Sequence, residues 1–309
     1  MAQNNFKPFA IGNGANVSSQ ADYEALAALA SGFQSGKASS AQINKALRQS
    51  TVMAYVLAQF ISDSTTSDVL DDGNPATILA NLKSGMTALT PGRLINVQIL
   101  TSSGTYVPSS GTKKIIVEVI GGGGGSGGLG GTGTNQVVIS AGGGSGTYAR
   151  VLISNPTQTS VTVGTGGAGG LGQNGATGGR GGNSVFGTFV TVEGGFGSSV
   201  GLSKAMPAFG IPTSGSPQLT YANCTLLSFS YGGAGTPGFV TANGDAVAGA
   251  GGTSFFGLGG DGNGSKGTGR PGISPGSGGG GVCVSDSSYG QTTTGARGAD
   301  GICVIWEYS

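Results

Sequence analysis

Residues 166–181 read GGAGGLGQNGATGGRG and decide the fold, because glycine occupies every third position from Gly166 to Gly181. The same spacing runs from Gly121 to Gly133 and returns in shorter form at 232–238 and 295–301. A period of three fits neither an α-helix nor a β-strand, but it matches the three-residue turn of a left-handed polyproline-II-type helix. The spacing therefore predicts polyglycine-II helices.

Glycine at every third position is compatible with a collagen triple helix, a flexible linker or a packed bundle of glycine helices. Collagen needs abundant proline, and the 11 prolines of this chain avoid both long glycine runs. A linker has no reason to keep register, whereas each run here stops at a clear strand pattern. We therefore favour the bundle, in which bare backbones approach closely enough for their N–H and C=O groups to pair.

Composition divides the chain into two parts. Only seven of the 66 glycines fall in the first hundred of 309 residues, and Thr90-Pro91-Gly92 marks the change. We predict a helical region at 1–92 and a glycine-rich region at 93–309. The net charge of +1, with no basic stripe, argues against nucleic acid. No apolar run is long enough for membrane insertion and no signal-peptide pattern is present, so we expect assembly in a cytoplasm.

The first region carries helix signals. Ser19 and Asp22 form a capping-box pattern, which predicts one helix after Ser19 that ends near Gly32 or Gly36. Ser39 with Gln42 begins a helix of about 25 residues. A short helix is expected from Ala76 to Ser84, after Pro75 and before Gly85. Along the long helix, apolar positions form two adjacent seams, Ile43-Leu47-Ala54-Leu57-Ile61 and Ala46-Met53-Val56-Phe60. So broad a band suits a helix in a small oligomer, or else a core helix of a monomeric domain.

From residue 93 the pattern becomes that of strands. Two-residue alternation predicts strands at 94–100, 106–108, 114–120, 148–153, 160–163, 185–192 and 301–308. The fold class expected is therefore α+β, with a helical N-terminal anchor followed by a tip domain of strands and polyglycine-II helices. GGNSVFG at 181–187 and GGTSFFG at 251–257 form an internal repeat, whose Phe186 and Phe256 are expected to cover the end of the glycine bundle.

The chain has few residues that could take part in catalysis or bind a metal. The chain has no histidine, which excludes Ser-His and Cys-His triads, and its three cysteines lack zinc-ligand spacing. We expect buried free thiols, although a Cys283–Cys303 disulfide stays open. We predict no enzyme activity, no metal and no cofactor. The remaining catalytic alternative is a carboxylate pair, drawn from Glu118, Glu193, Asp245, Asp261, Asp286, Asp300 and Glu307. Of these, Glu118 and Glu307 are expected to face solvent from their strands.

Two stretches carry a resemblance to a known family. The first stretch resembles the virion-attachment region of bacteriophage tail fibre proteins; it reads SAQINKALRQSTVMAYVLAQFISD, together with the segments beside it. The second stretch resembles the glycine-rich C-terminal domain of such fibres; it reads LINVQILTSSGTYVPSSGTKKIIVEVIGGGGGSGG and includes the closing GADGICVIWEYS. The resemblance implies a homotrimeric receptor-binding protein of the virion. Residues 1–92 would attach to phage tail or baseplate proteins, and the tip would bind host lipopolysaccharide or an outer-membrane protein.

Binding residues are expected in the loops between glycine runs, since loops on a rigid scaffold commonly carry recognition. We predict Phe209, Tyr221, Tyr289 and Gln291 as receptor contacts. Two alternatives are a purely structural fibre component, with the glycine domain as a spacer, and a surface-polysaccharide depolymerase.

Overall fold

The computed structural model describes residues 2–33, 39–133, 135–172, 175–215, 218–242, 245–264, 266–284 and 292–309. Its contacts divide the chain into two compact units, one ending at Arg93 and the other beginning at Leu94. We call them the first unit and the second unit.

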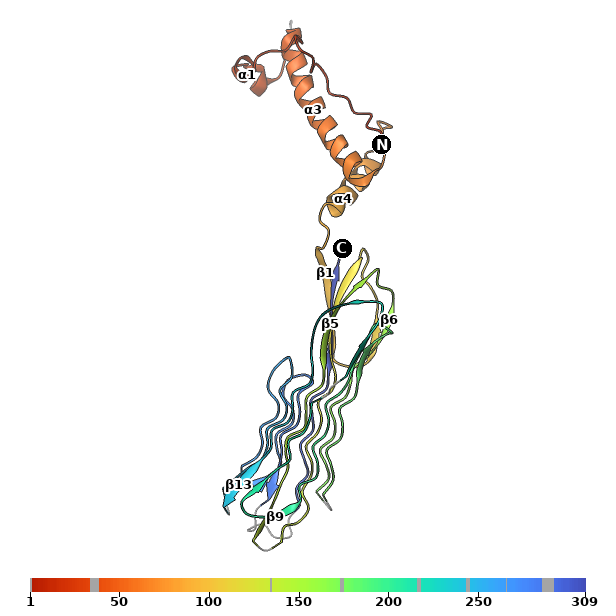
Figure 1. Ribbon diagram of the computed structural model, residues 1–309. Helices are drawn as coiled ribbons and strands as arrows, with labels where there is room; N and C mark the ends of the chain where they lie inside the picture. The colour runs from red at the N-terminus through yellow and green to blue at the C-terminus, as the bar shows by residue number, and fades with distance from the viewer. Residues whose placement is uncertain are drawn as a thin grey trace. The chain divides into compact units, whose positions relative to one another are not determined.

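The first unit is built around one long helix. Its helices are α1 (Gln20–Glu24), α2 (Ala28–Ser31), α3 (Ser40–Thr65) and α4 (Pro75–Ala88). An extended arm runs along α3 (Figure 1), where the Phe9 N–H donates to Thr51 Oγ1 at 3.1 Å. The Asn44 side-chain amide donates to the Asn16 carbonyl at 2.8 Å. Side-chain hydrogen bonds of this kind hold the arm on one side of α3.

Two helix predictions for this unit are wrong in detail. The region after Ser19 forms two short helices instead of one, and α4 continues through Gly85 to Ala88. At Gly85 an added Cβ would lie 2.4 Å from Ser64 Oγ on α3. The glycine therefore allows α3 and α4 to pack closely, and it does not end the helix.

The second unit begins with two five-stranded antiparallel sheets, ordered β1-β17-β3-β5-β12 and β11-β8-β7-β6-β2 (Figure 1). The first contains β1 (Leu94–Leu100), β17 (Ile302–Tyr308), β3 (Lys114–Ile120), β5 (Tyr148–Ser154) and β12 (Thr225–Ser230). The second contains β11 (Leu219–Tyr221), β8 (Val190–Val192), β7 (Ser184–Phe186), β6 (Thr159–Thr162) and β2 (Gly104–Tyr106). Alternate residues of β3 and β17 are buried, as strands with one core-facing side require. Together the two sheets form a sandwich.

The hydrophobic core of the sandwich takes side chains from both sheets. Val117, Val151 and Ile305 come from the first sheet and pack with Phe186 and Val192 of the second. All five are at most 1% exposed. Burial of this row of large side chains is the main stabilising term for the sandwich.

The glycine runs leave the sandwich and pack side by side as undulating chains (Figure 1). Their backbone hydrogen bonds follow a period of three. The N–H groups of Gly122, Gly125 and Gly128 donate to one neighbouring run, at the carbonyls of Gly182, Gly179 and Ala176. Those of Gly123 and Ser126 donate to a second neighbour, at Ala299 and Ala296, and that of Gly124 donates to a third, at Gly144. We call this packed region the glycine bundle.

The expected α+β class is wrong. The described chain is mostly β, with multiple antiparallel sheets, and its four helices all lie in the first unit. A helical anchor is only partly present, because the arm before α1 and the segment from Thr66 to Asn74 are not helical. The arm bonds to α3 through side chains instead of forming its own helical turns. Among the described helices, none is long and apolar enough to cross a membrane.

The strands also differ from the prediction. The stretch 185–192 forms two strands, β7 and β8, because Gly187 turns the chain with a φ of +50°. Beyond the predicted strands, the far part of the second unit contains β4 (Gln136–Ile139), β9 (Ser203–Ala205), β10 (Ala208–Phe209), β13 (Phe239–Ala242), β14 (Asp245–Val247), β15 (Lys266–Gly267) and β16 (Cys283–Val284). These short strands form two further sheets, β10-β13-β14 and β15-β16-β4-β9.

All three cysteines are free, and Cys283 and Cys303 are buried in separate hydrophobic clusters. Burial raises the pKa of Cys283 to about 11 and that of Cys303 to about 12. Because the thiolate is the reactive form, we expect iodoacetamide at pH 8 to modify the partly exposed Cys224 first. Peptide mass spectrometry should find Cys283 and Cys303 unmodified until urea unfolds the chain. Equal labelling of all three in the native protein would contradict this burial.

Candidate functional site

A row of exposed apolar side chains crosses the sheet β10-β13-β14, at the end of the second unit opposite the sandwich (Figure 1). Phe209 lies opposite Phe239, which in turn lies opposite Val247. Residues directly opposite one another project from the same face of a sheet. These three side chains are 68%, 47% and 47% exposed. We call Phe209, Phe239 and Val247 the distal row.

The other face of this small sheet is anchored. Ala208, Val240 and Ala246 are buried and pack in one cluster with Val137 and Ile139 of β4. The sheet is therefore fixed to the end of the glycine bundle, and the distal row is held in a defined position. Three large apolar groups in contact with water, on a backbone with an anchored reverse side, are typical of a binding surface.

A polar groove adjoins the distal row. Gly264 forms a β-bridge with Val247, and the Asn263 carbonyl accepts a hydrogen bond from the Ala248 N–H at 2.9 Å. The groove has a volume of about 450 Å³ and is lined by Asp261, Gly262, Asn263, Gly264, Thr268 and Arg270. The Arg270 guanidinium lies 3.6 Å from the Asp261 carboxylate, with both side chains largely exposed. Apolar and hydrogen-bonding surface thus lie side by side.

Of the four predicted contact residues, the two that the structure describes lie in different sheets. Phe209 belongs to the distal row, whereas Tyr221 lies in β11, opposite Val190, in a sheet of the sandwich. Tyr289 and Gln291 lie outside the described residues. Sequence reasoning missed Phe239 and Val247, although the Asn-Gly pair between FVTA and DAV is a strong hairpin signal that could have indicated them.

The internal repeat has two different environments. In the first copy Phe186 is fully buried and packs against Tyr106, with ring centroids 5.7 Å apart. In the second copy Phe255 stacks on Tyr148 at 3.7 Å, and Phe256 stands at 86° to the same Tyr148 ring. Phe255 and Phe256 are 57% and 38% exposed. Matching motifs here do not produce matching burial.

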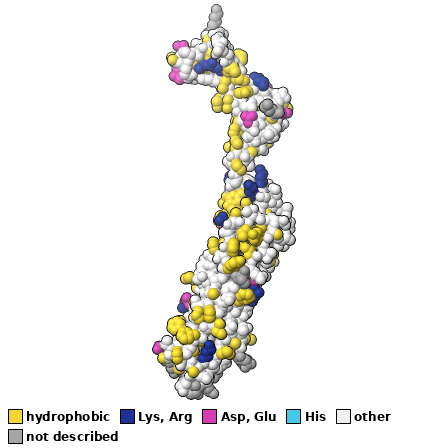
Figure 2. Space-filling view, viewed as in Figure 1, with side chains coloured by type: hydrophobic (Ala, Val, Ile, Leu, Met, Phe, Trp, Pro, Cys, Tyr) yellow, Lys and Arg dark blue, Asp and Glu magenta, His cyan; other side chains and the backbone are white. Residues whose placement is uncertain are grey.

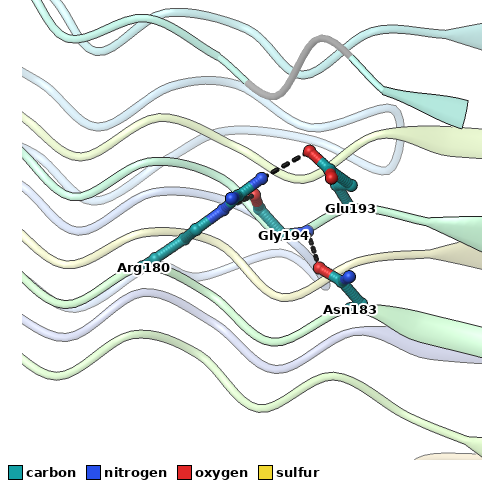
Figure 3. A network of polar contacts seen from close by, with 4 residues as sticks. All are labelled: Arg180, Asn183, Glu193 and Gly194. Atoms are coloured by element: carbon teal, nitrogen blue, oxygen red, sulfur yellow. Dashed lines mark hydrogen bonds and ion pairs between the residues drawn. The ribbon is translucent and has the colours of Figure 1, made fainter.

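Glu193 belongs to a network of hydrogen bonds and an ion pair at the place where the glycine bundle meets the sandwich (Figure 3). Its carboxylate pairs with Arg180, whose Nε donates to the Gly194 carbonyl at 3.3 Å. The Gly194 N–H in turn donates to Asn183 Oδ1 at 3.2 Å. The Arg180 guanidinium also lies 4.4 Å from the centroid of the Phe196 ring. These contacts join the exit of one glycine run to the start of the next.

Other candidate carboxylates also have partners. Glu118 lies 3.3 Å from Arg150 across the sheet, and Asp300 pairs with Arg297 while accepting the Gly166 N–H. Asp286 lies outside the described residues. No group of three or more metal-binding side chains occurs in the part of the chain that the structure describes.

Glu307 corrects a prediction, because its side chain is fully buried and does not face solvent. Its carboxylate accepts hydrogen bonds from Tyr106 Oη at 2.8 Å, the Ser109 N–H at 2.9 Å and Ser109 Oγ at 2.6 Å. Burial by itself would raise the pKa of Glu307, but hydrogen bonds from Ser109, Tyr106 and Asn96 outweigh it and lower that pKa below the usual 4.5. The donors compensate the cost of burying the charge.

Residues 100–308, about two thirds of the chain, match the family model described as a glycine-rich domain. No curated protein matches this chain.

Proposed function

This chain belongs to the glycine-rich domain family, and on that premise we propose that it is a receptor-binding protein of a bacteriophage tail fibre. In this proposal the second unit adsorbs to the surface of a host bacterium. The first unit attaches to tail or baseplate proteins of the virion, as the resemblance of residues 1–92 implies.

The observation that carries the proposal is the distal row on its anchored sheet. Phe209, Phe239 and Val247 lie where the glycine bundle ends, next to a groove that offers carboxylate, guanidinium, amide and hydroxyl groups. Large apolar anchors beside polar groups are the usual composition of a recognition surface. Because the sheet that carries these side chains is anchored through its other face, little backbone entropy is lost on binding.

Binding of the purified full-length chain to cells of candidate hosts tests the proposal. We expect Phe239→Ser to weaken cell binding by at least about tenfold, as for an anchor residue in an interface. Phe229→Ser is the matched control, because it replaces another phenylalanine that is 47% exposed on a strand, β12, which lies in the sandwich. Its binding should equal that of the unaltered chain. Co-sedimentation with cells, measured as bound fraction against protein concentration, gives both affinities.

Competition with phage adsorption separates this function from that of a spacer. The unaltered chain should reduce adsorption of the phage that carries it, and Phe239→Ser should not. Cells stripped of lipopolysaccharide and cells lacking individual outer-membrane proteins then identify the receptor class. Failure of the unaltered chain to bind any cells or to compete would overturn the proposal in favour of a structural fibre component.

A further inference from the structure

Strand β1 is an open edge of the sandwich. It pairs with β17 on one side, and no described strand pairs with its other side. Its seven residues include no charge and no proline, which are common means of blocking an exposed edge. The other edge strands of the sandwich are protected, because β12 carries a β-bulge and β2 and β11 have only three residues each. β1 is therefore the edge that is available to a further strand.

Hydrogen bonds at the end of β3 fix which backbone groups of β1 are open. The Gly121 N–H donates to the Thr147 carbonyl at 3.1 Å, and these two residues flank the opposed residues Ile120 and Tyr148. In an antiparallel ladder, such a bond marks the opposed residues as a pair that exchanges no hydrogen bonds. The Ile120 backbone therefore bonds to β17 instead. Carried across β17, this alternation directs three residues of β1 toward β17, namely Asn96, Gln98 and Leu100.

The residues between these three face the open edge. The N–H and C=O groups of Val97 and Ile99 point away from β17, because bond directions alternate along a strand. No printed backbone bond outside the ladder involves either residue in the part of the chain that the structure describes. The Ile99 side chain is 62% exposed, so solvent reaches this edge. An added strand would find two donors and two acceptors here, at the spacing of a β-ladder.

The two faces of β1 define the side chains that such a strand would carry. Asn96 and Gln98 lie opposite Glu307 and Ile305, the core-facing residues of β17. Val97 and Ile99 therefore project from the outer face of the sheet, beside three further apolar residues of β17, namely Ile302, Val304 and Trp306. Figure 2 shows hydrophobic side chains at the surface of the sandwich. A strand that continues both faces alternates apolar with polar residues.

A second folded copy of this chain would make a small contact at this edge. Two copies joined through β1 would pair along its regular part, which runs from Asn96 to Leu100. A stable interface between folded proteins uses about 20–30 residues on each side. An extended segment does not need so large a surface, because main-chain hydrogen bonds give it affinity and its alternate side chains give it specificity. The edge therefore fits an extended segment better than a folded copy.

We infer that β1 binds an extended segment of a different protein, which adds a strand at the open edge. The backbone of the segment bonds to Val97 and Ile99, its apolar side chains continue the outer face, and its polar side chains lie beside Asn96 and Gln98. The distal row takes no part in this contact. The inference therefore does not depend on the proposed adhesion function, and its test involves no host cells.

Selection of short peptides from a ribosome-displayed library, with the full-length chain as the target, tests the inference. We expect the enriched peptides to alternate apolar and polar residues. Ile99→Pro removes one N–H from the open edge and leaves the bonds to β17 in place, so it should weaken peptide binding by at least about tenfold. Ile99→Val is the matched control, because it keeps that N–H and a β-branched side chain, and it should bind as the unaltered chain does.

Hydrogen exchange on the unaltered chain keeps the test informative if Ile99→Pro disturbs the sandwich. An enriched peptide should slow the exchange of the Val97 and Ile99 amides, which exchange quickly without it. The inference is overturned if no alternating peptide is enriched, or if the enriched peptides leave these two amides unprotected. Slow exchange of both amides before any peptide is added would also overturn it, because a copy of the chain would then already cover the edge.

Discussion

Replacing Gly123 with alanine is expected to lower the free energy of unfolding of the second unit by more than about 3 kcal/mol. An added Cβ would lie 1.9 Å from the Ser277 carbonyl oxygen. This oxygen belongs to the backbone of a neighbouring segment of the same chain, so no change of rotamer can relieve the clash. The Gly123 N–H also donates to the Ala299 carbonyl, and its carbonyl accepts the Gly167 N–H. Any shift that relieves the clash therefore lengthens hydrogen bonds to two neighbours.

Urea unfolding followed by tryptophan fluorescence measures this effect, because the single tryptophan, Trp306, lies in β17 of the second unit. Gly264→Ala is the matched control, since the nearest atom to its added Cβ is 3.7 Å away. That variant should stay within about 0.5 kcal/mol of the unaltered chain. If both variants unfold at the same urea concentration, close backbone packing does not stabilise the glycine bundle.

Replacing Glu307 with alanine should cost about 2–3 kcal/mol at pH 7, because the buried Tyr106 hydroxyl and the Ser109 groups lose a charged acceptor. Glu118→Gln is the control in the neighbouring strand. Glu118 pairs with a partly exposed Arg150, and its loss should cost less than about 1 kcal/mol. Urea titrations of the three proteins give the comparison.

The contribution of Glu307 should depend on pH in a defined direction. Its pKa is lower in the folded protein than the usual 4.5, so the unfolded chain binds the proton more readily. The stabilisation is complete above pH 4.5 and decreases as the pH falls through the folded pKa. Glu307→Gln cannot titrate at this position, so the stability difference between it and the unaltered chain should shrink from pH 6 to pH 3. A constant difference would show that the lowered pKa is wrong.

Much of the fold can be read locally. The alternation in KIIVEVI and GICVIWEY predicts β3 and β17 nearly to the residue, because a strand with one buried face leaves a two-residue pattern. The long helix begins directly after Ser39, as the sequence predicts, although the Ser39 side chain makes no capping hydrogen bond. The short strands β10, β13 and β14 have too few residues to show a period, so only the Asn-Gly pair between β13 and β14 indicates any of them.

The candidate site was predictable only in part. The sequence places Phe209 in a loop-rich segment between glycine runs. Its neighbours Phe239 and Val247 lie 30 or more residues later in the chain, and only strand pairing brings them beside Phe209. Tyr221 looked equivalent in sequence and lies in the sandwich instead. Phe209 and Tyr221 are both aromatic residues in similar segments, and nothing in those segments indicates which end of the second unit each residue occupies.

The sequence by itself determined the three-residue glycine period, the helix start at Ser39 and the alternation of the long strands, because each depends on neighbours within a few positions. Tertiary structure decided which backbones face Gly123 and why Glu307 is buried among donors. Those outcomes depend on which distant segments of the chain pack against these residues. A glycine or a carboxylate is compatible with many environments, so its own sequence position does not specify which one it has.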